Sequence, residues 1–334
     1  MSLGLKAFLA LTLTFAASML LAPVVIRLMK KLKAGQVILG YVEQHSAKSG
    51  TPTMGGIIFL LPVAAVTLAL GYGRLSLVAV LVMLGYGLLG FLDDFLKIKT
   101  KNNLGLKPYQ KIIGQLGIAV IVGVFCYKNP VVGSAVNLPF TDKVWELKWW
   151  YVPFTVLVYV ATTNAVNLTD GLDGLAGSVS TVYFAAFFFI ALASAKNYEY
   201  YGQVLNFAEA QGIAVFAASV TGGLAAFIWH NFNPAKIMMG DTGSLALGGA
   251  AATVAVFTKN PLLILSAGIM FVVSCISVIL QVIYFKLTKK RVFLMAPYHH
   301  HLEKKGYTEW KIVCWYTVVT LLFSTLSLFS AGVI

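Results

Sequence analysis

The chain has 334 residues, of which 59% are hydrophobic and only 11% are charged, whereas soluble domains carry about 25% charged residues. Its formal net charge is +13, but the basic residues lie between long apolar runs. Positive-inside loops and anionic lipid headgroups explain such a charge better than nucleic acid does. The composition therefore excludes a soluble globular domain and predicts a membrane protein with no nucleic-acid partner.

Ten apolar segments are candidate membrane spans, since a helix needs about 20 residues to cross the hydrocarbon core. The first is retained rather than removed as a signal peptide, because its apolar run is too long and basic residues follow it. The eighth is short, so a re-entrant or buried helix is an alternative there. The segments are Ala7–Ile26, Gly55–Leu70, Leu75–Leu92, Ile112–Tyr127, Trp149–Val166, Leu175–Ala195, Gly212–Trp229, Leu245–Phe257, Leu262–Phe285 and Ile312–Val333.

The expected fold is an all-α polytopic membrane protein with ten transmembrane helices. Most of the 25 Lys and Arg residues fall on one side if the N-terminus lies outside, as the positive-inside rule requires. Both termini are then outside. In the outer loop from Lys128 to Lys148, alternating residues on both sides of Thr141-Asp142 predict a short β-hairpin on the periplasmic side.

Carboxylates and histidines follow several of these spans. An aspartate in the bilayer centre costs about 3 kcal/mol, so such residues call for an explanation. If the eighth segment crosses, all four groups lie at the cytoplasmic face, which predicts one polar site there. The groups are Asp93-Asp94 after the third span, Asp170 and Asp173 after the fifth, Asp241 after the seventh and His299–His301 after the ninth.

The segment FLDDFLK places Lys97 four residues after Asp93, on the same helix face, while Asp94 points about 100° away. Such a cluster offers carboxylate oxygens to a hard cation and an ammonium group to a phosphate. An ordinary ion pair at a helix end is the alternative.

The segment NAVNLTDGLDGLAG carries four polar residues at intervals of three, which cannot share one face of a continuous helix. Glycines at 171 and 174 predict that the helix breaks and that the polar groups surround a site, unless they only cap helix ends. The four residues are Asn164, Asn167, Asp170 and Asp173.

Asp241 lies between Gly240 and Gly243, just before an apolar helix. The glycines and Ser244 permit a tight turn whose N–H groups face a phosphate while Asp241 holds a metal. An aspartate that only caps the helix is the alternative.

The run MAPYHHHLEKKG, residues 295–306, contains three of the five histidines. Adjacent histidines cannot all reach one zinc ion, so contact with an anion is the better interpretation. A solvated basic loop near lipid headgroups is the alternative.

Taken together, these motifs resemble the phospho-N-acetylmuramoyl-pentapeptide-transferases, the bacterial translocase I family of the polyprenyl-phosphate N-acetylhexosamine-1-phosphate transferase superfamily. The resemblance runs nearly end to end. The DD, NxxNxxDGxDG and GD patterns are shared with the superfamily, whereas TPTMGG and MAPYHHHLEKKG are typical of translocase I. The matching segments are SAKSGTPTMGG, GFLDDFLK, NAVNLTDGLDGLAG, MGDTGSLALGG, SVILQV and MAPYHHHLEKKG.

The resemblance implies a single integral-membrane transferase domain, residues 1–334, in the bacterial cytoplasmic (inner) membrane, with its active site facing the cytoplasm. It implies a homodimer that uses Mg²⁺ to transfer phospho-MurNAc-pentapeptide from UDP-MurNAc-pentapeptide to undecaprenyl phosphate, forming lipid I and UMP. By motif position, Asp93, Asp94 and Asp241 are catalytic, and Asp241 is the metal ligand. The implied substrate-binding residues are Lys48, Thr53, Lys97, Lys111, Asn164, Asn167, Asp170, Asp173, Gln281, His299, His300 and His301.

Three alternatives stay open at this point. The transfer is either a single displacement, in which Asp93 accepts a proton if one must leave, or a two-step reaction through a phosphorylated aspartate. A transporter is the rival from another class, although transport favours carboxylates near mid-membrane rather than at one face. The sister transferase that uses UDP-N-acetylglucosamine lacks the MAPYHHH segment.

Overall fold

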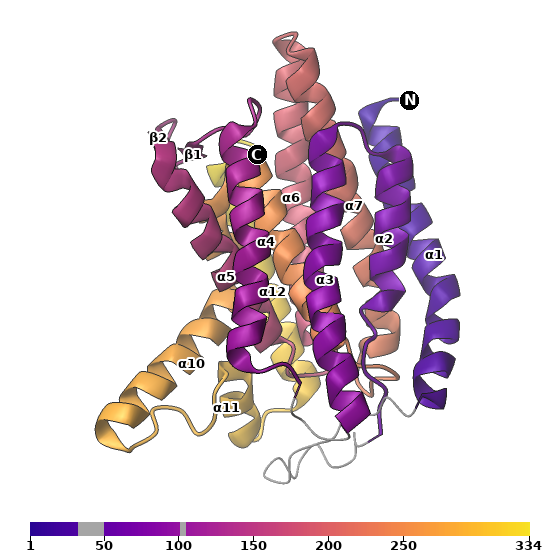
Figure 1. Cartoon of the computed structure of the whole chain (residues 1–334), viewed down its shortest axis with the longest axis vertical. Helices are drawn as coiled ribbons and strands as arrows, with labels where there is room; N and C mark the ends of the chain where they lie inside the picture. Colours follow the sequence, from indigo (N-terminus) through magenta and orange to yellow (C-terminus); the bar gives the residue numbers. More distant parts are fainter. Residues whose placement is uncertain (33–49, 101–104) are drawn as a thin grey trace.

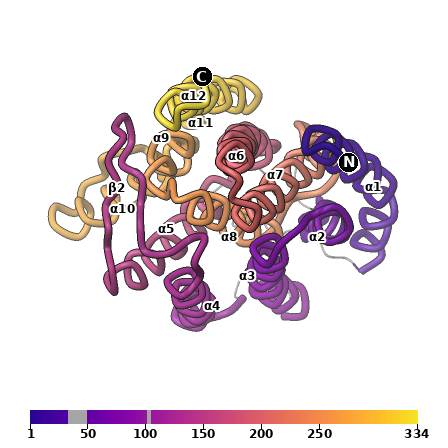
Figure 2. Tube along the Cα trace, turned by 90° about the horizontal axis from the view of Figure 1, so that it is seen from above, coloured from indigo at the N-terminus to yellow at the C-terminus, as the bar shows by residue number. Residues whose placement is uncertain are grey.

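The computed structural model describes residues 1–32, 50–100 and 105–334. In this part of the chain the helices form one bundle, and a two-stranded sheet lies at one end of it (Figures 1 and 2). The longer elements are α1 (Leu3–Lys31), α2 (Ile57–Leu70), α3 (Arg74–Thr100), α4 (Pro108–Lys128), β1 (Ala135–Asn137), β2 (Val144–Glu146), α5 (Tyr151–Thr169), α6 (Leu175–Tyr200), α7 (Val204–Asn231), α8 (Gly240–Phe257), α10 (Ile269–Thr288), α11 (Tyr298–Lys304) and α12 (Glu309–Ser330).

Eight helices of the described residues are long and apolar enough to cross a membrane. The prediction of an all-α polytopic membrane protein is thereby confirmed. Two of the ten predicted segments are not among these eight: α2, which is apolar but has only 14 residues, and α8, which corresponds to the doubtful eighth segment.

Helix α8 lies at the centre of the bundle (Figure 2), and every residue from Thr242 to Phe257 is buried. Small residues allow its neighbours to approach closely. A Cβ atom added at Gly248 would lie 2.4 Å from Thr163 Cα on α5, and one at Gly249 would lie 2.4 Å from the Tyr86 ring on α3. Helix α8 is thus a core element around which the longer helices pack.

The predicted hairpin is confirmed, and its turn contains Thr141-Asp142. Strands β1 and β2 are antiparallel, with Ala135 opposite Glu146. The Asn137 N–H donates to the Lys259 carbonyl, 2.9 Å away, just beyond the end of α8. Figure 1 shows this hairpin and both chain termini at the same end of the bundle.

The ninth apolar segment, Leu262–Phe285, contains a span but is not one continuous helix. A 3₁₀ turn (η3, Pro261–Leu263) and a short helix (α9, Ile264–Ala267) precede a break at Gly268, after which α10 begins. A Cβ atom at residue 268 would lie 2.7 Å from the Ile264 carbonyl oxygen, so glycine permits the bend there. Helix α10 then leaves the bundle at an angle (Figure 1).

The end of the bundle opposite the hairpin is where the predicted site residues come from. The C-terminal ends of α3 and α5 and the N-terminal ends of α4 and α8 meet there, and α11 lies at the same end (Figure 1). Helix ends carry unpaired backbone groups and admit polar side chains. The fold therefore gathers its polar residues at one end of an apolar bundle.

Replacing Gly222 with Ala tests the close packing of α7 on α1. The added Cβ would lie 2.1 Å from the Leu11 carbonyl oxygen, so the helices must separate, at a cost of about 1–3 kcal/mol. We expect a melting temperature several degrees lower in detergent. Gly117→Ala on α4, where no atom lies within 4 Å, is the control and should melt no lower than the wild type. Equal melting temperatures for the two variants would contradict this packing.

Candidate active site

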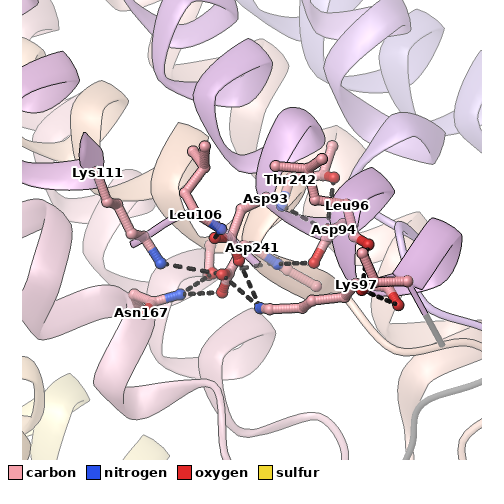
Figure 3. Close-up of polar contacts among 12 residues, drawn as sticks. Asp93, Asp94, Leu96, Lys97, Leu106, Lys111, Asn167, Asp241 and Thr242 are labelled. Atoms are coloured by element: carbon pink, nitrogen blue, oxygen red, sulfur yellow. Dashed lines mark hydrogen bonds and ion pairs between the residues drawn. The ribbon is translucent and has the colours of Figure 1, made fainter. Parts of the chain in front are cut away.

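Three aspartates meet where the end of α3 touches the start of α8. Asp93, Asp94 and Asp241 each offer a carboxylate oxygen, and these oxygens lie within 4.8 Å of one another (Figure 3). Asp93 and Asp94 are only 3% exposed. The approach depends on Gly90, because a Cβ atom there would lie 2.0 Å from the Asp241 carbonyl oxygen.

Asp241 is bound by side chains from three other helices. Its Oδ2 atom lies 2.9 Å from Lys97 Nζ of α3 and 2.9 Å from Lys111 Nζ of α4. Its Oδ1 atom accepts a 2.7 Å hydrogen bond from Asn167 Nδ2 of α5. Residues far apart in the sequence therefore converge on one carboxylate (Figure 3).

Asp93 is enclosed by its own helix and by the segment before α4. It forms an i,i+4 ion pair with Lys97, the alternative that the spacing left open, and its Oδ1 atom accepts a 2.8 Å hydrogen bond from the Leu106 N–H. Gly105 packs so closely that a Cβ atom there would lie 2.5 Å from Oδ1. Both Asp93 oxygens are thus engaged, Oδ1 by the Leu106 N–H and Oδ2 by the Lys97 ammonium group.

Asp94 faces the first turn of α8. It accepts hydrogen bonds from the N–H groups of Asp241 and Thr242, at 3.2 and 2.9 Å, and from the Thr242 hydroxyl, at 2.7 Å. The sequence suggested that N–H groups of this turn face a phosphate. For these two groups the expectation is wrong in this structure, because a carboxylate from α3 already accepts their hydrogen bonds.

The polar turn between α5 and α6 has the predicted break. Helix α5 ends at Thr169, and Gly174 takes a positive φ of 79° before α6 begins. Asn167 reaches Asp241, whereas Asn164, one turn deeper, donates to Gln115 Oε1 of α4 at 2.7 Å. Asn167 therefore belongs to the carboxylate cluster, and Asn164 lies beside it.

The two aspartates of this turn differ in their surroundings. Burial away from water, together with the charges of Asp241, Asp94 and Asp173, raises the pKa of Asp170 to about 8. Asp173 Oδ2 accepts the Ala235 N–H at 3.0 Å. Asp173 thus connects the turn to the segment between α7 and α8.

The three histidines have different surroundings. His299 is fully buried against Gly171, where a Cβ atom would lie 2.2 Å from its Nε2 atom. His300 Nδ1 lies 2.5 Å from a Glu303 oxygen. His301 Nδ1 accepts the Leu294 N–H at 3.1 Å. The histidine run thus touches the Asp170–Asp173 turn through His299.

Six of the predicted site residues form one cluster of direct contacts. The others lie at its border or away from it. Thr53 borders the cluster, because a Cβ atom at Gly240 would lie 2.7 Å from its hydroxyl oxygen. Gln281 accepts the Phe293 N–H at 2.9 Å, and Lys48 lies outside the described residues. The six residues in direct contact are Asp93, Asp94, Lys97, Lys111, Asn167 and Asp241.

Three contributors were not predicted. Thr242 stands directly after Asp241, but its sequence position does not reveal that it faces α3. Gln115 follows Lys111 by one helical turn, which is a usable signal because residues at i and i+4 share a face. The Leu106 backbone N–H leaves no mark in the sequence.

The carboxylate oxygens of the cluster are suitable ligands for a hard divalent cation. Carboxylate oxygens are the protein ligands that Mg²⁺ prefers, and here they meet within one small cluster. Two lysines beside them provide positive charge for phosphate groups. The fold and site define a multi-pass membrane protein with an acidic, metal-competent centre suited to phosphate chemistry at one end of its helices.

Comparison with known proteins identifies the family. The model of "Glycosyl transferase family 4" matches residues 76–259, and signature 1 of the phospho-N-acetylmuramoyl-pentapeptide-transferases matches residues 48–60. The enzyme of this name from Clostridium botulinum (strain Alaska E43 / Type E3) is 45% identical over 316 residues, 94% of this chain and 93% of the relative. The enzyme of the same name from Thermoanaerobacter sp. (strain X514) is 45% identical over 327 residues, which cover 97% of this chain and 98% of the relative. The chain belongs to the phospho-N-acetylmuramoyl-pentapeptide-transferase family.

Asp170→Asn tests the burial of the Asp170 carboxyl group. The folded protein keeps this proton up to about pH 8, whereas an unfolded chain loses it near pH ~4. The contribution of Asp170 to the free energy of unfolding therefore falls as pH rises through this window and levels off above it. With EDTA present, we expect the melting temperature of the wild type to drop by several degrees more than that of Asp170→Asn between pH 6 and pH 9. Parallel pH profiles would contradict the assignment.

Proposed function

We propose that the carboxylate cluster is the centre at which this enzyme transfers phospho-MurNAc-pentapeptide from UDP-MurNAc-pentapeptide to undecaprenyl phosphate. The products are lipid I and UMP, and the reaction is a membrane step of peptidoglycan synthesis. The observation that carries the proposal is the contact of Asp93, Lys97, Lys111 and Asp241 at one end of the bundle, in a chain of this family.

Mg²⁺ is the cofactor, with Asp241 as its principal ligand and Asp93 beside it. When bound, the ion neutralises charge on the pyrophosphate of the donor. Asp241 is the better ligand because it is the most exposed of the three aspartates, with 16% of its side chain accessible, and because it lies at the centre of the cluster.

Lys97 and Lys111 bind the phosphate groups of the substrates. Both contact the same oxygen of Asp241, and both ammonium groups would be available to phosphate oxygens if Asp241 held the cation instead. The two lysines come from different helices and reach Asp241 from separate positions (Figure 3). They are therefore placed to hold two phosphate groups near each other, as transfer between them requires.

The transfer is a single displacement. The lipid phosphate attacks the β-phosphorus of the donor, and UMP leaves. A phosphate monoester is mostly dianionic at neutral pH, with a second pKa near ~6, so the nucleophile needs little help from a base. Asp93 is a poor covalent nucleophile because it is 3% exposed and both of its oxygens are engaged. Its role is to orient Lys97 and to accept a proton if one must leave.

The remaining predicted residues form the walls of the donor site. Thr53 and Asn164 border the cluster, while His299 links the histidine run to the Asp170–Asp173 turn. His300, His301, Gln281 and Lys48, the last outside the described residues, complete the proposed donor contacts. The N–H groups of the histidines donate hydrogen bonds to the anionic UDP-MurNAc-pentapeptide.

The proposed topology has ten spans, with both termini outside and the active site facing the cytoplasm of a bacterial inner membrane. Asp241 lies at the start of α8 and Lys259, just after its end, contacts the hairpin, so α8 runs the length of the bundle. Because α8 crosses the bundle, the chain has an even number of spans and both termini lie at the same end (Figure 1). Residues 1–334 form one domain, and two chains form a homodimer.

Asp241→Asn should abolish most turnover even at saturating Mg²⁺, by on the order of 100-fold or more, because a charged ligand at the phosphates is lost. Lipid I formation from radiolabelled donor is the measurement, with elution on size exclusion as the check of folding. Asp142→Asn in the exposed hairpin turn is the control and should retain wild-type turnover. Near-normal activity of Asp241→Asn would refute the ligand assignment.

Donor choice separates this enzyme from its sister transferase. With undecaprenyl phosphate as acceptor, we expect product from UDP-MurNAc-pentapeptide and none from UDP-N-acetylglucosamine. His300→Ala should lower kcat/KM for the donor by about tenfold, since it removes one contact with a charged group, while leaving the half-saturating Mg²⁺ concentration unchanged. Use of both donors at similar rates would contradict the assigned substrate.

Isotope exchange distinguishes single displacement from a covalent intermediate. Enzyme freed of lipid phosphate should not incorporate labelled UMP into UDP-MurNAc-pentapeptide, because a single displacement forms no covalent enzyme intermediate and releases UMP only when the acceptor attacks. Adding undecaprenyl phosphate should start the exchange. Exchange without acceptor would establish the two-step route instead.

A further inference from the structure

The N-terminus of α8 is capped by a side chain of another helix. The first N–H groups of a helix have no partner within it, and a nearby carboxylate is favoured by hydrogen bonding and by the helix dipole. Asp94 of α3 takes this position, with Oδ1 on the Asp241 N–H and Oδ2 on the Thr242 N–H and hydroxyl (Figure 3). Asp241 does not cap its own helix, so its carboxylate is free to face the lysines.

The backbone around this cap is fixed on its other side as well. The N–H groups of Gly55 and Gly56 donate to the carbonyls of Met238 and Met239, at 2.9 and 3.0 Å. Gly240 has a φ of 73°, and a Cβ atom there would lie 2.6 Å from Asp94 Oδ2. The direction of the Asp241 side chain is thus set by contacts on both sides of the turn.

The Thr242 hydroxyl donates to a carboxylate of another helix. Thr253, on the same helix, donates to the carbonyl of Gly249 four residues earlier, which is the usual pattern for threonine inside a helix, and also bonds the Tyr159 hydroxyl of α5. Thr242 is 2% exposed, and its hydroxyl donates to Asp94 on α3. It therefore links α8 directly to the Asp93–Asp94 pair.

We propose that Thr242 is a positioning residue for the transfer reaction: its hydroxyl fixes Asp94 against the first turn of α8, and this holds Asp241 toward Asp93, Lys97 and Lys111. Asp94 acts through the same contacts rather than as a metal ligand, because it is only 3% exposed and two of its three donors are backbone N–H groups fixed in the first turn of α8. The donors to Asp241 are side chains, and 16% of the Asp241 side chain is accessible. This inference rests on the proposed function, since it assigns how that centre is held in place.

The test compares Thr242→Val, which removes the hydroxyl at nearly constant shape, with Thr242→Ser, which restores it. For Thr242→Val we expect kcat to fall on the order of tenfold, as for loss of a buried hydrogen bond to a charged group, with the donor KM little changed. Mn²⁺ affinity, measured by electron paramagnetic resonance without substrates, should weaken several-fold. Thr242→Ser should return both values to within about twofold of the wild type.

Asp94→Asn gives the complementary result. It should weaken Mn²⁺ binding less than Asp241→Asn does, because the amide oxygen still accepts a hydrogen bond from the α8 turn. Equal loss of Mn²⁺ binding in the two variants would show that Asp94 is a ligand and would overturn the inference.

Thr253→Val is the matched control, since it removes from α8 a buried hydroxyl that bonds Tyr159 of α5, away from the site. It should leave kcat and Mn²⁺ affinity unchanged, whatever its effect on the melting temperature. Wild-type kinetics and Mn²⁺ affinity in Thr242→Val, or failure of Thr242→Ser to rescue, would refute the positioning role. Failure of the proposed function is distinguishable, because the wild-type enzyme would then form no lipid I.

Discussion

Charge balance among buried carboxylates is the constraint on which the site depends. Asp93, Asp94 and Asp241 lie within one small cluster, and like charges at this separation repel strongly where water is scarce. Lys97 and Lys111 offset part of that repulsion, and backbone N–H groups offset more. With three carboxylates against two ammonium groups, the cluster retains formal negative charge, which favours a divalent cation.

The bundle makes this arrangement possible through small residues at its centre. Helix α8 is buried along nearly its whole length, and Gly90, Gly248 and Gly249 let α3 and α5 approach its backbone. Close approach brings the ends of these helices together, and α4 adds Lys111 from the side. The packing that stabilises the core therefore also determines which side chains meet at its end.

Much of the fold could be predicted from the sequence because the underlying signals are local. Apolar length predicts membrane helices, alternation predicts the hairpin, and the glycines at 171 and 174 predict the break after α5. The bend at Gly268 was missed, because an apolar run of that length is typical of one continuous helix. The interior position of α8 was only an alternative, since burial within a bundle depends on the neighbouring helices.

The sequence predicts which residues form the site better than it predicts which of them contact one another. Aspartates and lysines in a membrane protein stand out from their surroundings, and the spacing of Asp93 and Lys97 specifies their ion pair. The role of Asp94 as a cap for α8 depends on how two helices pack, as does the contact of Asn164 with Gln115. Sequence spacing places Gln115 on the same helix face as Lys111, but it does not identify the partner helix in either contact.

The metal centre is tested most directly by anomalous diffraction from crystals of the enzyme soaked in Mn²⁺, an ion that occupies magnesium sites. We expect one peak at the Asp241 carboxylate, beside Asp93, with Asp94 still bonded to Thr242. A peak at the Asp170–Asp173 turn or at the histidines, or none at saturating Mn²⁺, would contradict the assignment of the metal centre.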